Sequence, residues 1–352
     1  MPKLTFYGHF TGNSSYPMVC RAIAGWMVSQ DIDVSLVNLR GAPIEGELAG
    51  HQAALSSEAE LPGPALLFGF PSWLDCVPHH HPMLSYHVGD VSPLPADWST
   101  PINERSDQVL TPSLWCADLL SGLGIKSSVV RHGIDPQVCR PADDDNPPER
   151  IILRHFCSSP FLARKGTVET LQAAVALLSL GGFADVLVRV SAPAKCVPAL
   201  SRQYAGHFYG GQIDIVVDEP RSAEDMAEEL RSVTAVVQPS RAEGFGLIPL
   251  EAVACGTPVV LTDATGHCEY AKSLGAAALE VRTTGFGRCG EGSAPVLDPL
   301  SLRSAMEESI RERTVLRQCA RDASPFIRQE WSWRAILDAE LLPILASLDV
   351  FP

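Results

Sequence analysis

The sequence predicts an α/β protein built from two open parallel-sheet domains. Apolar segments of strand length alternate with helix-length segments up to residue 134, a proline- and aspartate-rich run interrupts the alternation at 141–150, and the alternation then resumes. Short apolar strands separated by helices are typical of a parallel sheet with helices on both faces. A chain of 352 residues is long enough for two such domains, each with its own core.

The first half of the chain contains six predicted strands. They are expected at 4–10, 33–39, 64–70, 83–90, 108–113 and 128–134, with a first helix inside 12–30. The run PADDDNPPER (141–150) has three prolines and three consecutive aspartates, which favour neither helix nor strand, and we predict a linker there. The expected N-terminal domain therefore covers 1–141 and the linker 142–150.

The second half repeats the pattern. Strands are expected at 151–159, 185–191, 213–219, 234–240 and 258–264, and helices at 168–182 and 247–255. The expected C-terminal domain covers 151–327. The segment RQEWSWRAILDAELLPIL (328–345) is predicted as the last helix, within a terminal segment of 328–352.

Composition and charge limit the classes of function. A hydrophobic content of 46% and a charged content of 19% indicate a globular protein, and no apolar run reaches the roughly 18 residues of a membrane span. The N-terminus lacks the pattern of a signal peptide, so a cytoplasmic location is expected. The ten cysteines are scattered without a C-x-x-C pair and are expected to be reduced and mostly buried. A net charge of -14 disfavours nucleic acid or an anionic membrane as partner.

The stretch RAEGFGLIPLEAVACGTPVV (241–260) carries two glutamates, Glu243 and Glu251. Ligands of open parallel sheets lie beyond the carboxyl ends of the strands, and this stretch begins as the loop after a predicted strand. Glu243 belongs to that loop, and Glu251 lies about two turns along the next helix, on the order of 10 Å away. Gly244 and Gly246 precede the helix N-terminus, which favours a phosphate. Carboxylates that bind hydroxyls on either side of a phosphate site predict a nucleotide sugar as ligand.

The same stretch, as EGFGLIPLEAVACGTPVV, resembles the E-x7-E signature of the family-four retaining glycosyltransferases. RHGIDPQVCRP (131–141) resembles the family's HG-[IV]-D-x-x-x-F-x-P segment, with Cys139 in place of the phenylalanine. ARKGTVETLQAAVALL (163–178) resembles its R-K-G segment, and DQVLTPSLWCADLLSGLGI (107–125) resembles the stretch that closes its first domain. The resemblance implies the GT-B fold, in which two Rossmann-like domains face each other across a cleft and the last helix crosses back to the first domain.

The resemblance also implies roles for residues of the second half. Glu243 would contact hydroxyls of the donor sugar, Glu251 would contact the ribose, and two cations would neutralise the leaving diphosphate. The implied donor-binding residues are Gly12, Arg164, Lys165, Glu243, Gly244, Phe245, Gly246, Leu247 and Glu251. The family often has a further arginine shortly before the lysine, where this sequence has Pro160, and either of the two cations can take its part.

The first domain is expected to hold the acceptor. The loop GHFTGNSS (8–15) is small and contains Gly12, so a phosphate or an acceptor can approach it closely. The resemblance places His87 near the sugar as a catalytic and acceptor-binding residue, and Asp90 of the same loop would orient the acceptor. The implied catalytic residues are Glu243, His87, Arg164 and Lys165.

The three consecutive histidines His79, His80 and His81 raise the question of a metal site. Consecutive residues point in different directions and do not form the i, i+4 face of a ligand pair. We expect them in an exposed loop near the acceptor, and no metal site is predicted.

The sequence therefore predicts a retaining, metal-independent glycosyltransferase without a cofactor, which uses a nucleoside diphosphate sugar, with UDP as the expected nucleotide. Three alternatives stay open: a nucleotide-sugar epimerase of the same fold, a transferase that acts on DNA or a modified nucleobase, and a non-catalytic nucleotide-sugar-binding protein. Residues 1–110 contain four basic and eleven acidic side chains. This balance repels polyanions and predicts a soluble, polar acceptor that is neutral or cationic.

Overall fold

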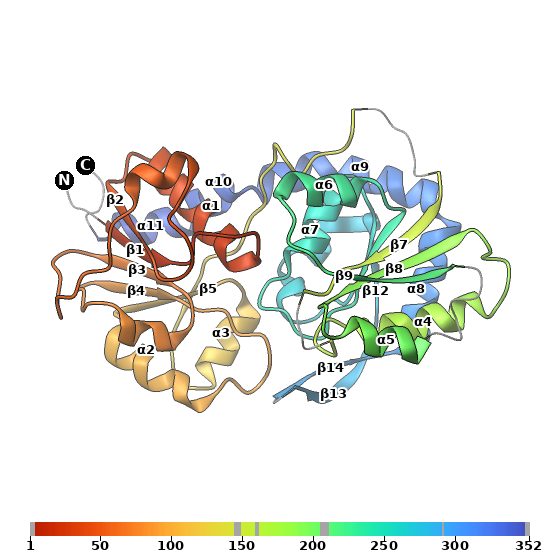
Figure 1. The fold of residues 1–352 in the computed structure, drawn as a ribbon, viewed down its shortest axis with the longest axis horizontal. Coiled ribbons are helices and arrows are strands. Elements are labelled where there is room, and N and C mark those ends of the chain that lie inside the picture. The colour runs from red at the N-terminus through yellow and green to blue at the C-terminus, as the bar shows by residue number, and fades with distance from the viewer. Residues whose placement is uncertain (1–3, 144–148, 159–161, 205–210, 291, 349–352) are drawn as a thin grey trace. The chain divides into compact units, whose positions relative to one another are not determined.

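The structure, a computed structural model, describes residues 4–143, 149–158, 162–204, 211–290 and 292–348. The chain forms two compact units (Figure 1): unit 1 comprises Met1–Gly133 and Trp331–Pro352, and unit 2 comprises Ile134–Glu330. The boundaries expected from the sequence, at 141, 150 and 327, differ from this division and stay a prediction. Residues 144–148 of the expected linker lie outside the described residues.

Unit 1 contains a parallel sheet whose described strands run in the order β2-β1-β3-β4-β5-β6. The strands are β1 (Leu4–Gly8), β2 (Val34–Asn38), β3 (Ala65–Phe68), β4 (Met83–Tyr86), β5 (Gln108–Thr111) and β6 (Ser128–Val129). The helices of its first part are α1 (Ser15–Ser29), α2 (Ser99–Arg105) and α3 (Leu114–Ser121), with the 3₁₀ turns η1 (Gly46–His51), η2 (Pro71–Cys76) and η3 (Ala96–Trp98). Each strand lies within a predicted segment, and the rest of that segment forms a loop.

Side chains that alternate along the strands divide the core of unit 1 into two layers. Leu66 and Phe68 of β3 pack in the layer that contains α1, whereas Ala65 and Leu67 pack in the layer that contains α2 and α3. Both faces of a central strand are therefore apolar. This is why the strands are continuous apolar runs in the sequence.

Unit 2 contains a second parallel sheet, with described strands in the order β12-β11-β10-β7-β8-β9. The strands are β7 (Ile151–His155), β8 (Val186–Ala192), β9 (Ile213–Val217), β10 (Ala235–Gln238), β11 (Val259–Leu261) and β12 (Ala278–Glu280). Figure 1 shows helices on both sides of the sheet, where α4 packs with α8 on one face and α7 packs with α6 and α9 on the other. The helices are α4 (Thr167–Leu178), α5 (Val197–Tyr204), α6 (Ala223–Arg231), α7 (Leu247–Ala254), α8 (Pro299–Arg311) and α9 (Arg313–Glu330), with 3₁₀ turns η5 (Thr265–Glu269) and η6 (Ala271–Ala277).

An antiparallel hairpin follows β12 and forms a small sheet of its own. Its strands are β13 (Thr283–Cys289) and β14 (Gly292–Leu297). No apolar alternation predicts this hairpin, because its segment is rich in glycine and polar residues.

The prediction of one last helix over 328–345 is wrong. The helix α9 ends at Glu330, and the chain continues as α10 (Trp333–Ile336), a π-helical turn (Leu337–Leu341) and α11 (Leu342–Ala346). Ser332 has an extended backbone, and its hydroxyl accepts a hydrogen bond from the N–H of Ala335, so it caps a new helix. The segment after this break packs in the core of unit 1 through Leu337, Leu341 and Leu345.

The cysteines are free thiols, as their scattered positions predict. No disulfide joins any two of the ten, and six of them are buried. Burial raises the pKa of Cys20 to about 12, so this thiol stays protonated and packs as a small apolar group. None of the helices in the described part of the chain combines the length and the apolar character needed to span a bilayer.

The strand orders give each unit one topological switch point. In unit 1 the neighbours β1 and β3 connect onward in opposite directions, to β2 and to β4, and in unit 2 the neighbours β7 and β10 do the same. Ligands of open parallel sheets bind outside the carboxyl ends of the strands at such points. The loops after β7 and β10, and those after β1 and β3, are therefore the expected ligand loops.

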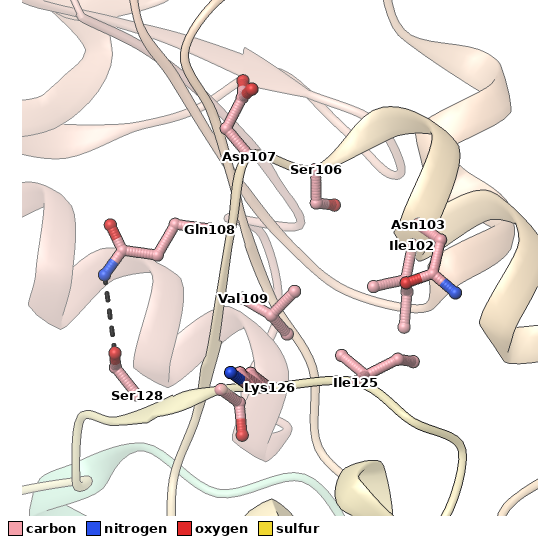
Figure 2. Close-up of a pocket in the computed structure, with 10 residues that line it drawn as sticks. Ile102, Asn103, Ser106, Asp107, Gln108, Val109, Ile125, Lys126 and Ser128 are labelled. Atoms are coloured by element: carbon pink, nitrogen blue, oxygen red, sulfur yellow. Dashed lines mark hydrogen bonds between the residues drawn. The ribbon is translucent and has the colours of Figure 1, made fainter.

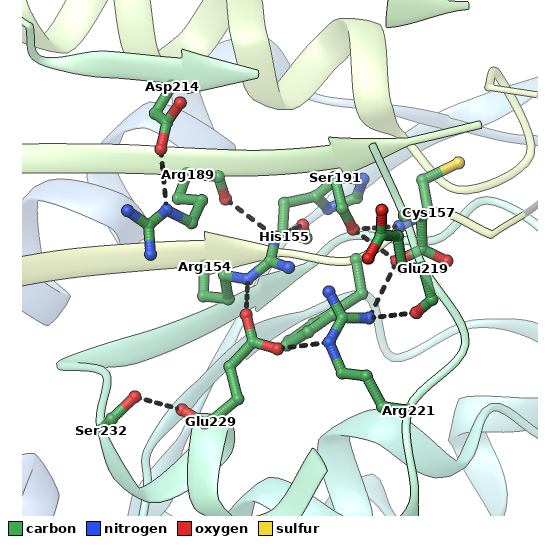
Figure 3. Close-up of polar contacts among 12 residues, drawn as sticks. Arg154, His155, Cys157, Arg189, Ser191, Asp214, Glu219, Arg221, Glu229 and Ser232 are labelled. Atoms are coloured by element: carbon green, nitrogen blue, oxygen red, sulfur yellow. Dashed lines mark hydrogen bonds and ion pairs between the residues drawn. The ribbon is translucent and has the colours of Figure 1, made fainter. Parts of the chain in front are cut away.

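Unit 2 buries an arginine within its sheet (Figure 3). The side chain of Arg154, in β7, is 1% exposed, and its Nε donates to Glu229 of α6 at 2.6 Å. Glu229 also pairs with Arg221 at 2.7 Å. The Arg154 guanidinium lies over the Phe156 ring, 4.1 Å from its centroid, and Nη1 donates to the His155 carbonyl at 2.6 Å. Glu229 is thus the carboxylate that neutralises a fully buried cation.

Removing this carboxylate should destabilise the protein. Glu229→Ala leaves the Arg154 guanidinium buried without its counter-ion, and we expect the free energy of unfolding to fall by about 3 kcal/mol. Asp214→Ala is the matched control, because the side chains of Asp214 and of its ion-pair partner Arg189 are 37% and 41% exposed. Loss of this exposed ion pair should lower the free energy of unfolding by less than about 1 kcal/mol. Urea denaturation measures both, and equal losses would contradict the argument.

Candidate functional site

The switch point of unit 2 brings together two cations and one carboxylate. Arg164 and Lys165 lie in the loop between β7 and α4, and Glu243 lies in the loop between β10 and α7. The Nζ of Lys165 donates to one carboxylate oxygen of Glu243 at 2.5 Å, and the Nη1 of Arg164 lies 3.5 Å from the other. The sequence predicts each of these residues separately, and the structure shows that they contact one another. Pro160 lies outside the described residues, so the residue that replaces the family's arginine stays a prediction.

The ionisation of Glu243 depends on these cations. Burial alone would raise the pKa of Glu243, but the charges of Lys165 and Arg164 lower it to about 2. The carboxylate is therefore ionised at neutral pH although its side chain is only 7% exposed. Two cations around one carboxylate leave a net charge of plus one at the edge of the sheet.

Backbone contacts hold the two loops together. The carbonyl of Arg164 accepts hydrogen bonds from the N–H groups of Arg241 at 2.8 Å and Ala242 at 3.3 Å, and the Nη1 of Arg164 donates to the Ala242 carbonyl at 3.2 Å. Gly166 has a φ of +68°, and a Cβ at this position would lie 2.3 Å from the carbonyl oxygen of Pro239. A side chain there would push the loops apart, which explains the glycine of the R-K-G segment.

The helix α7 starts directly after the loop of Glu243. Gly246 precedes it with a φ of +83°, and a Cβ at this glycine would lie 2.5 Å from the Nε2 of His267. The hydroxyl of Tyr270 donates to the carbonyl of Gly246, and its ring lies 5.4 Å from that of Phe245. The first turn of α7 is thus fixed beside the two cations. Its positive end favours an anion at the same place.

Glu251 lies one to two turns further along α7. It is 9% exposed, and its carboxylate makes no hydrogen bond or ion pair with any residue that the structure describes. Burial raises the pKa of Glu251 to about 7. A carboxyl group without a partner in an apolar helix is costly, and a ligand that donates hydrogen bonds would satisfy it.

Three residues of η5, which the sequence analysis did not single out, complete the loop of Glu243. The hydroxyl of Thr265 accepts from the N–H of Glu243 at 3.2 Å, and the N–H of Gly266 donates to the Glu243 carbonyl at 2.9 Å. The Nδ1 of His267 lies 3.2 Å from the Thr262 carbonyl, while its buried Nε2 has no partner within the described part of the chain. Burial lowers the pKa of His267, so the ring is neutral. The only feature of the sequence that could have indicated Thr265, Gly266 and His267 is that they follow the predicted strand 258–264.

Arg241 connects the loop of Glu243 to the hairpin, and its role was not predicted from the sequence. It is 7% exposed, its Nε donates to the Pro295 carbonyl at 2.7 Å, and its Nη2 donates to the carbonyls of Gly287 and Arg288 at 3.3 and 3.2 Å. Its Nη1 lies 3.7 Å from Glu169 in the first turn of α4. Arg241 therefore ties both strands of the hairpin to the two loops of the site. No sequence spacing indicates these contacts, since they are made to backbone carbonyls.

The predicted residues of the first half lie in unit 1. Gly12 is exposed in the loop after β1, and its carbonyl accepts from the Nη1 of Arg21 at 2.7 Å. His87 follows β4 and is fully buried; its Nδ1 lies 2.8 Å from the Gly69 carbonyl, and its Nε2 has no partner among the described residues. Burial lowers the pKa of His87 to about 4, so it is neutral at pH 7. Asp90 is half-buried in the same loop. Their roles stay predictions.

The expectation that His79, His80 and His81 are exposed is confirmed for His79 and His81 and wrong for His80, and their place near the acceptor stays a prediction. They precede β4 and thus lie at the amino ends of the strands, opposite the ligand loops. His80 is buried, with its Nε2 2.8 Å from the Tyr7 hydroxyl and its Nδ1 3.1 Å from the Gly63 carbonyl. In the described ranges, no three His, Cys, Asp or Glu side chains are grouped so that they could hold a metal ion.

A polar hollow of about 320 Å³ lies at the amino ends of β5 and β6 (Figure 2). Gln108 and Ser128, the first residues of these strands, hydrogen-bond across it at 3.5 Å, and Asp107 and Lys126 also line it. Because ligands of parallel sheets bind at the opposite edge, this hollow is separate from the ligand loops of unit 1.

Comparisons with known proteins agree with this arrangement. Residues 126–339 match the profile of a family described as family 4 glycosyltransferase in conflict systems. D-inositol 3-phosphate glycosyltransferase 1 of Catenulispora acidiphila is 28% identical over 204 residues, which are 52% of this chain and 44% of that protein. The chain thus spans less than half the length of this relative.

Two solved structures resemble the whole chain. Sucrose-phosphate synthase from Thermosynechococcus elongatus has a TM-score of 0.71 at 15% identity over 99% of both chains. Anabaena HepE in complex with UDP-glucose has a TM-score of 0.70 at 16% identity over 99% of this chain and 100% of that one. The likeness confirms the predicted GT-B fold.

The ion cluster of Arg164, Lys165 and Glu243 should contribute to the stability of the fold. Lys165→Met leaves the buried Glu243 carboxylate with only the more distant arginine, and we expect the free energy of unfolding at pH 7 to fall by about 3 kcal/mol. The depressed pKa of Glu243 gives stability above the ordinary carboxyl pKa that is lost as pH falls toward 2. The variant should therefore approach the wild type in stability as acid protonates Glu243.

Two controls accompany this measurement. Glu243→Gln in the Lys165→Met background should restore part of the stability, because it removes the unpaired charge. Lys126→Met removes an exposed lysine of unit 1 and should change the free energy of unfolding by less than about 0.5 kcal/mol. A Lys165→Met loss that is the same at pH 4 and pH 7 would contradict the role of the charge.

Proposed function

The chain belongs to the family 4 glycosyltransferases of conflict systems, and from this membership we propose that it moves a sugar from a nucleoside diphosphate sugar to a soluble, polar acceptor. The bond between the anomeric carbon and the phosphate oxygen breaks, and a bond to an acceptor hydroxyl oxygen forms. The acceptor's proton leaves with the nucleoside diphosphate. In keeping with the resemblance, the configuration at the anomeric carbon is retained.

One observation carries this proposal: two buried carboxyl groups flank the start of α7, and they are in opposite states. Glu243 is ionised and held by cations, whereas Glu251 has no partner among the described residues and a pKa of about 7. A ligand with hydroxyls at both ends and a phosphate between them satisfies all three features. In this proposal Glu243 binds the sugar hydroxyls, the N-terminus of α7 binds the diphosphate, and Glu251 binds the ribose hydroxyls.

The cations supply the electrostatic part of the reaction. Negative charge develops on the diphosphate oxygen as the bond to the sugar breaks, and fixed positive groups stabilise it without reorganisation. Lys165 and Arg164 are held at this place by Glu243, and together the three groups leave one net positive charge. The positive end of α7 adds to this field.

Support for a UDP-sugar donor comes from a structural neighbour. HepE, which resembles the whole chain in fold, holds UDP-glucose in its crystal structure. The sugar and the acceptor differ among the relatives, which include enzymes named for D-inositol 3-phosphate and for mannosyl transfer. We therefore take UDP-glucose as the first probe of the donor site, with GDP-, ADP- and dTDP-sugars as comparison.

The affinity for UDP-glucose should depend on the protonation of Glu251. Ribose hydroxyls donate hydrogen bonds to a carboxylate, so binding requires the ionised form, and the pKa of Glu251 in the free protein is about 7. We expect the Kd, measured by calorimetry, to fall roughly tenfold per pH unit up to pH 7 and to level off above it. Glu251→Gln should abolish this dependence and weaken binding by about 1.5–3 kcal/mol.

The same substitution should stabilise the free protein at high pH. A raised pKa means that folding keeps a proton which the unfolded chain releases, so the stability of the wild type declines as pH rises from about 4 to about 7. Glu251→Gln removes that decline, which amounts to roughly 3 kcal/mol at about 1.4 kcal/mol per pKa unit. Glu280→Gln, an exposed glutamate of β12, is the control for both measurements. Unchanged affinity for UDP-glucose in Glu251→Gln would refute the ribose role.

We also expect transfer without a divalent metal, because Lys165 and Arg164 supply the positive charge at the leaving diphosphate. Release of UDP that depends on an acceptor should proceed at the same rate with and without EDTA. Full loss in EDTA with recovery on addition of manganese would overturn this expectation.

A further inference from the structure

The switch point of unit 1 carries an aromatic cluster that the proposed donor chemistry does not use. We call Tyr16, Phe70 and Trp73 the aromatic platform. Tyr16 lies in the first turn of α1, which follows the loop after β1, and the other two follow β3. The platform therefore lies at the carboxyl ends of the two strands where the rule for open parallel sheets places a ligand.

The platform is built so that one ring stays open. Phe70 is 45% exposed and stacks on Tyr16 with ring centroids 5.5 Å apart and an angle of 17° between the planes. Trp73 supports it from the side, edge-on at 5.9 Å, and its own ring is pressed against the backbone at Gly69, where a Cβ would lie 2.3 Å from it. An exposed ring fixed by two others offers a flat apolar surface at low entropic cost.

A free cation lies beside the platform. The guanidinium of Arg40, in the loop after β2, lies over the Trp73 ring, 5.0 Å from its centroid, and it has no carboxylate partner within the part of the chain that the structure describes. The loop of Arg40 contacts the loop after β1, since the Thr11 hydroxyl donates to the Arg40 carbonyl at 3.4 Å. Arg40 is exposed, so its charge faces the same edge of the sheet as Phe70.

A second arginine adds positive charge to this place. The Nη1 of Arg21 donates to the carbonyls of Phe10 and Gly12 at 2.8 and 2.7 Å, so carbonyl oxygens rather than a carboxylate hold it. Burial, followed by the charges of Arg40 and Arg21, lowers the pKa of His9, which follows β1. Both arginines therefore act on the start of the Gly12 loop.

Carboxylates also follow the strands of this edge. Glu45 and Glu47 follow β2, as Arg40 does, and Asp75 belongs to η2, as Trp73 does. None of these three forms an ion pair with Arg21 or Arg40 in the described ranges. The guanidinium groups of Arg21 and Arg40 therefore contact no carboxylate of the described residues, although residues 1–110 are acidic in total.

We infer that unit 1 binds an acceptor made of a ring and an anionic group: the ring lies on Phe70, and a carboxylate or phosphate pairs with Arg40. This inference rests on the proposed function, because it assigns the acceptor of that same reaction. It reverses the sign of the acceptor charge expected from the sequence. The reason is that the expectation counts charges over 110 residues, whereas Arg40 is the charged side chain that lies against the platform.

A small acceptor fits better than a nucleic acid. Proteins that bind single strands combine several stacking aromatics with a basic groove that follows the backbone. Here one exposed ring and one free arginine lie in a chain with a net charge of -14. The net charge repels a polyanion, while the two local groups match one ring with one anionic substituent.

The test compares ligands that share a ring and differ in charge. Glucose, glucose 6-phosphate, glucuronate and glucosamine are titrated by calorimetry into the full chain saturated with UDP. We expect the two anions to bind about 10- to 100-fold more tightly than glucose, as for a hydrogen bond between charged groups, and glucosamine to bind more weakly than glucose. The phosphate and the carboxylate serve as separate arms, so the test also tells which anion the site prefers.

Variants assign the effect to the two groups. Arg40→Gln should remove the preference for anions with little change for glucose, whereas Phe70→Ala should weaken all ligands roughly tenfold, and Phe70→Tyr should restore them. Lys126→Gln removes an exposed positive charge from the opposite edge of the same sheet and should change nothing. The affinity for UDP should be that of the wild type in every variant.

The outcomes separate this inference from the proposed function. Loss of UDP binding in Glu251→Gln supports the donor site whatever the acceptor data show. Equal or weaker binding of both anions relative to glucose, or an anion preference that survives Arg40→Gln, would overturn the inference. Tighter binding of a single-stranded oligonucleotide than of either anion would overturn it as well, and would indicate a nucleic-acid acceptor.

Discussion

The site of unit 2 depends on one buried ion cluster. Glu243 can be ionised at 7% exposure only because Lys165 and Arg164 contact it, and the two cations keep their positions partly because Glu243 and the Ala242 carbonyl hold them. Neither side of the cluster would be stable at this depth alone. Gly166 then becomes obligatory, since the cluster draws the two loops to a distance at which no side chain fits between them.

The two glutamates of the E-x7-E pattern show how the environment gives one chemical group two different states of ionisation. Both are buried, yet the cations lower the pKa of Glu243 to about 2, while burial without a partner raises that of Glu251 to about 7. The ionised one is organised before the ligand arrives. The other has no partner among the described residues, and in the proposed complex the ribose hydroxyls relieve its desolvation cost. The proposed donor would then gain binding energy at Glu251 without any rearrangement of the cluster at Glu243.

The sequence predicts much of this because the relevant signals are local. Apolar runs mark strands with two buried faces, and the glycines and glutamates of 241–260 fix a loop and a helix start. What it misses depends on contacts between distant segments. Arg241 is held by hairpin carbonyls, which have no side-chain signature, and His80 looks like a surface residue until Tyr7 is placed beside it. The break at Ser332 escapes because the apolar spacing continues across it, and only the capping hydroxyl shows that a new helix starts.

Charge is the property for which composition and structure diverge most. A count over residues 1–110 gives an acidic domain, but at physiological salt exposed charges more than roughly 10 Å apart are largely screened from one another. A bound ligand lies closer than this to its partners, where individual groups dominate. Arg21 of α1 and Arg40 of the loop after β2 both act on His9, and neither forms an ion pair in the described ranges, although Glu45, Glu47 and Asp75 follow β2 and β3. If unit 1 binds the acceptor that we infer, the acidic net charge disfavours polyanions while Arg40 pairs with one small anion, so the net charge and a single side chain act on different classes of partner.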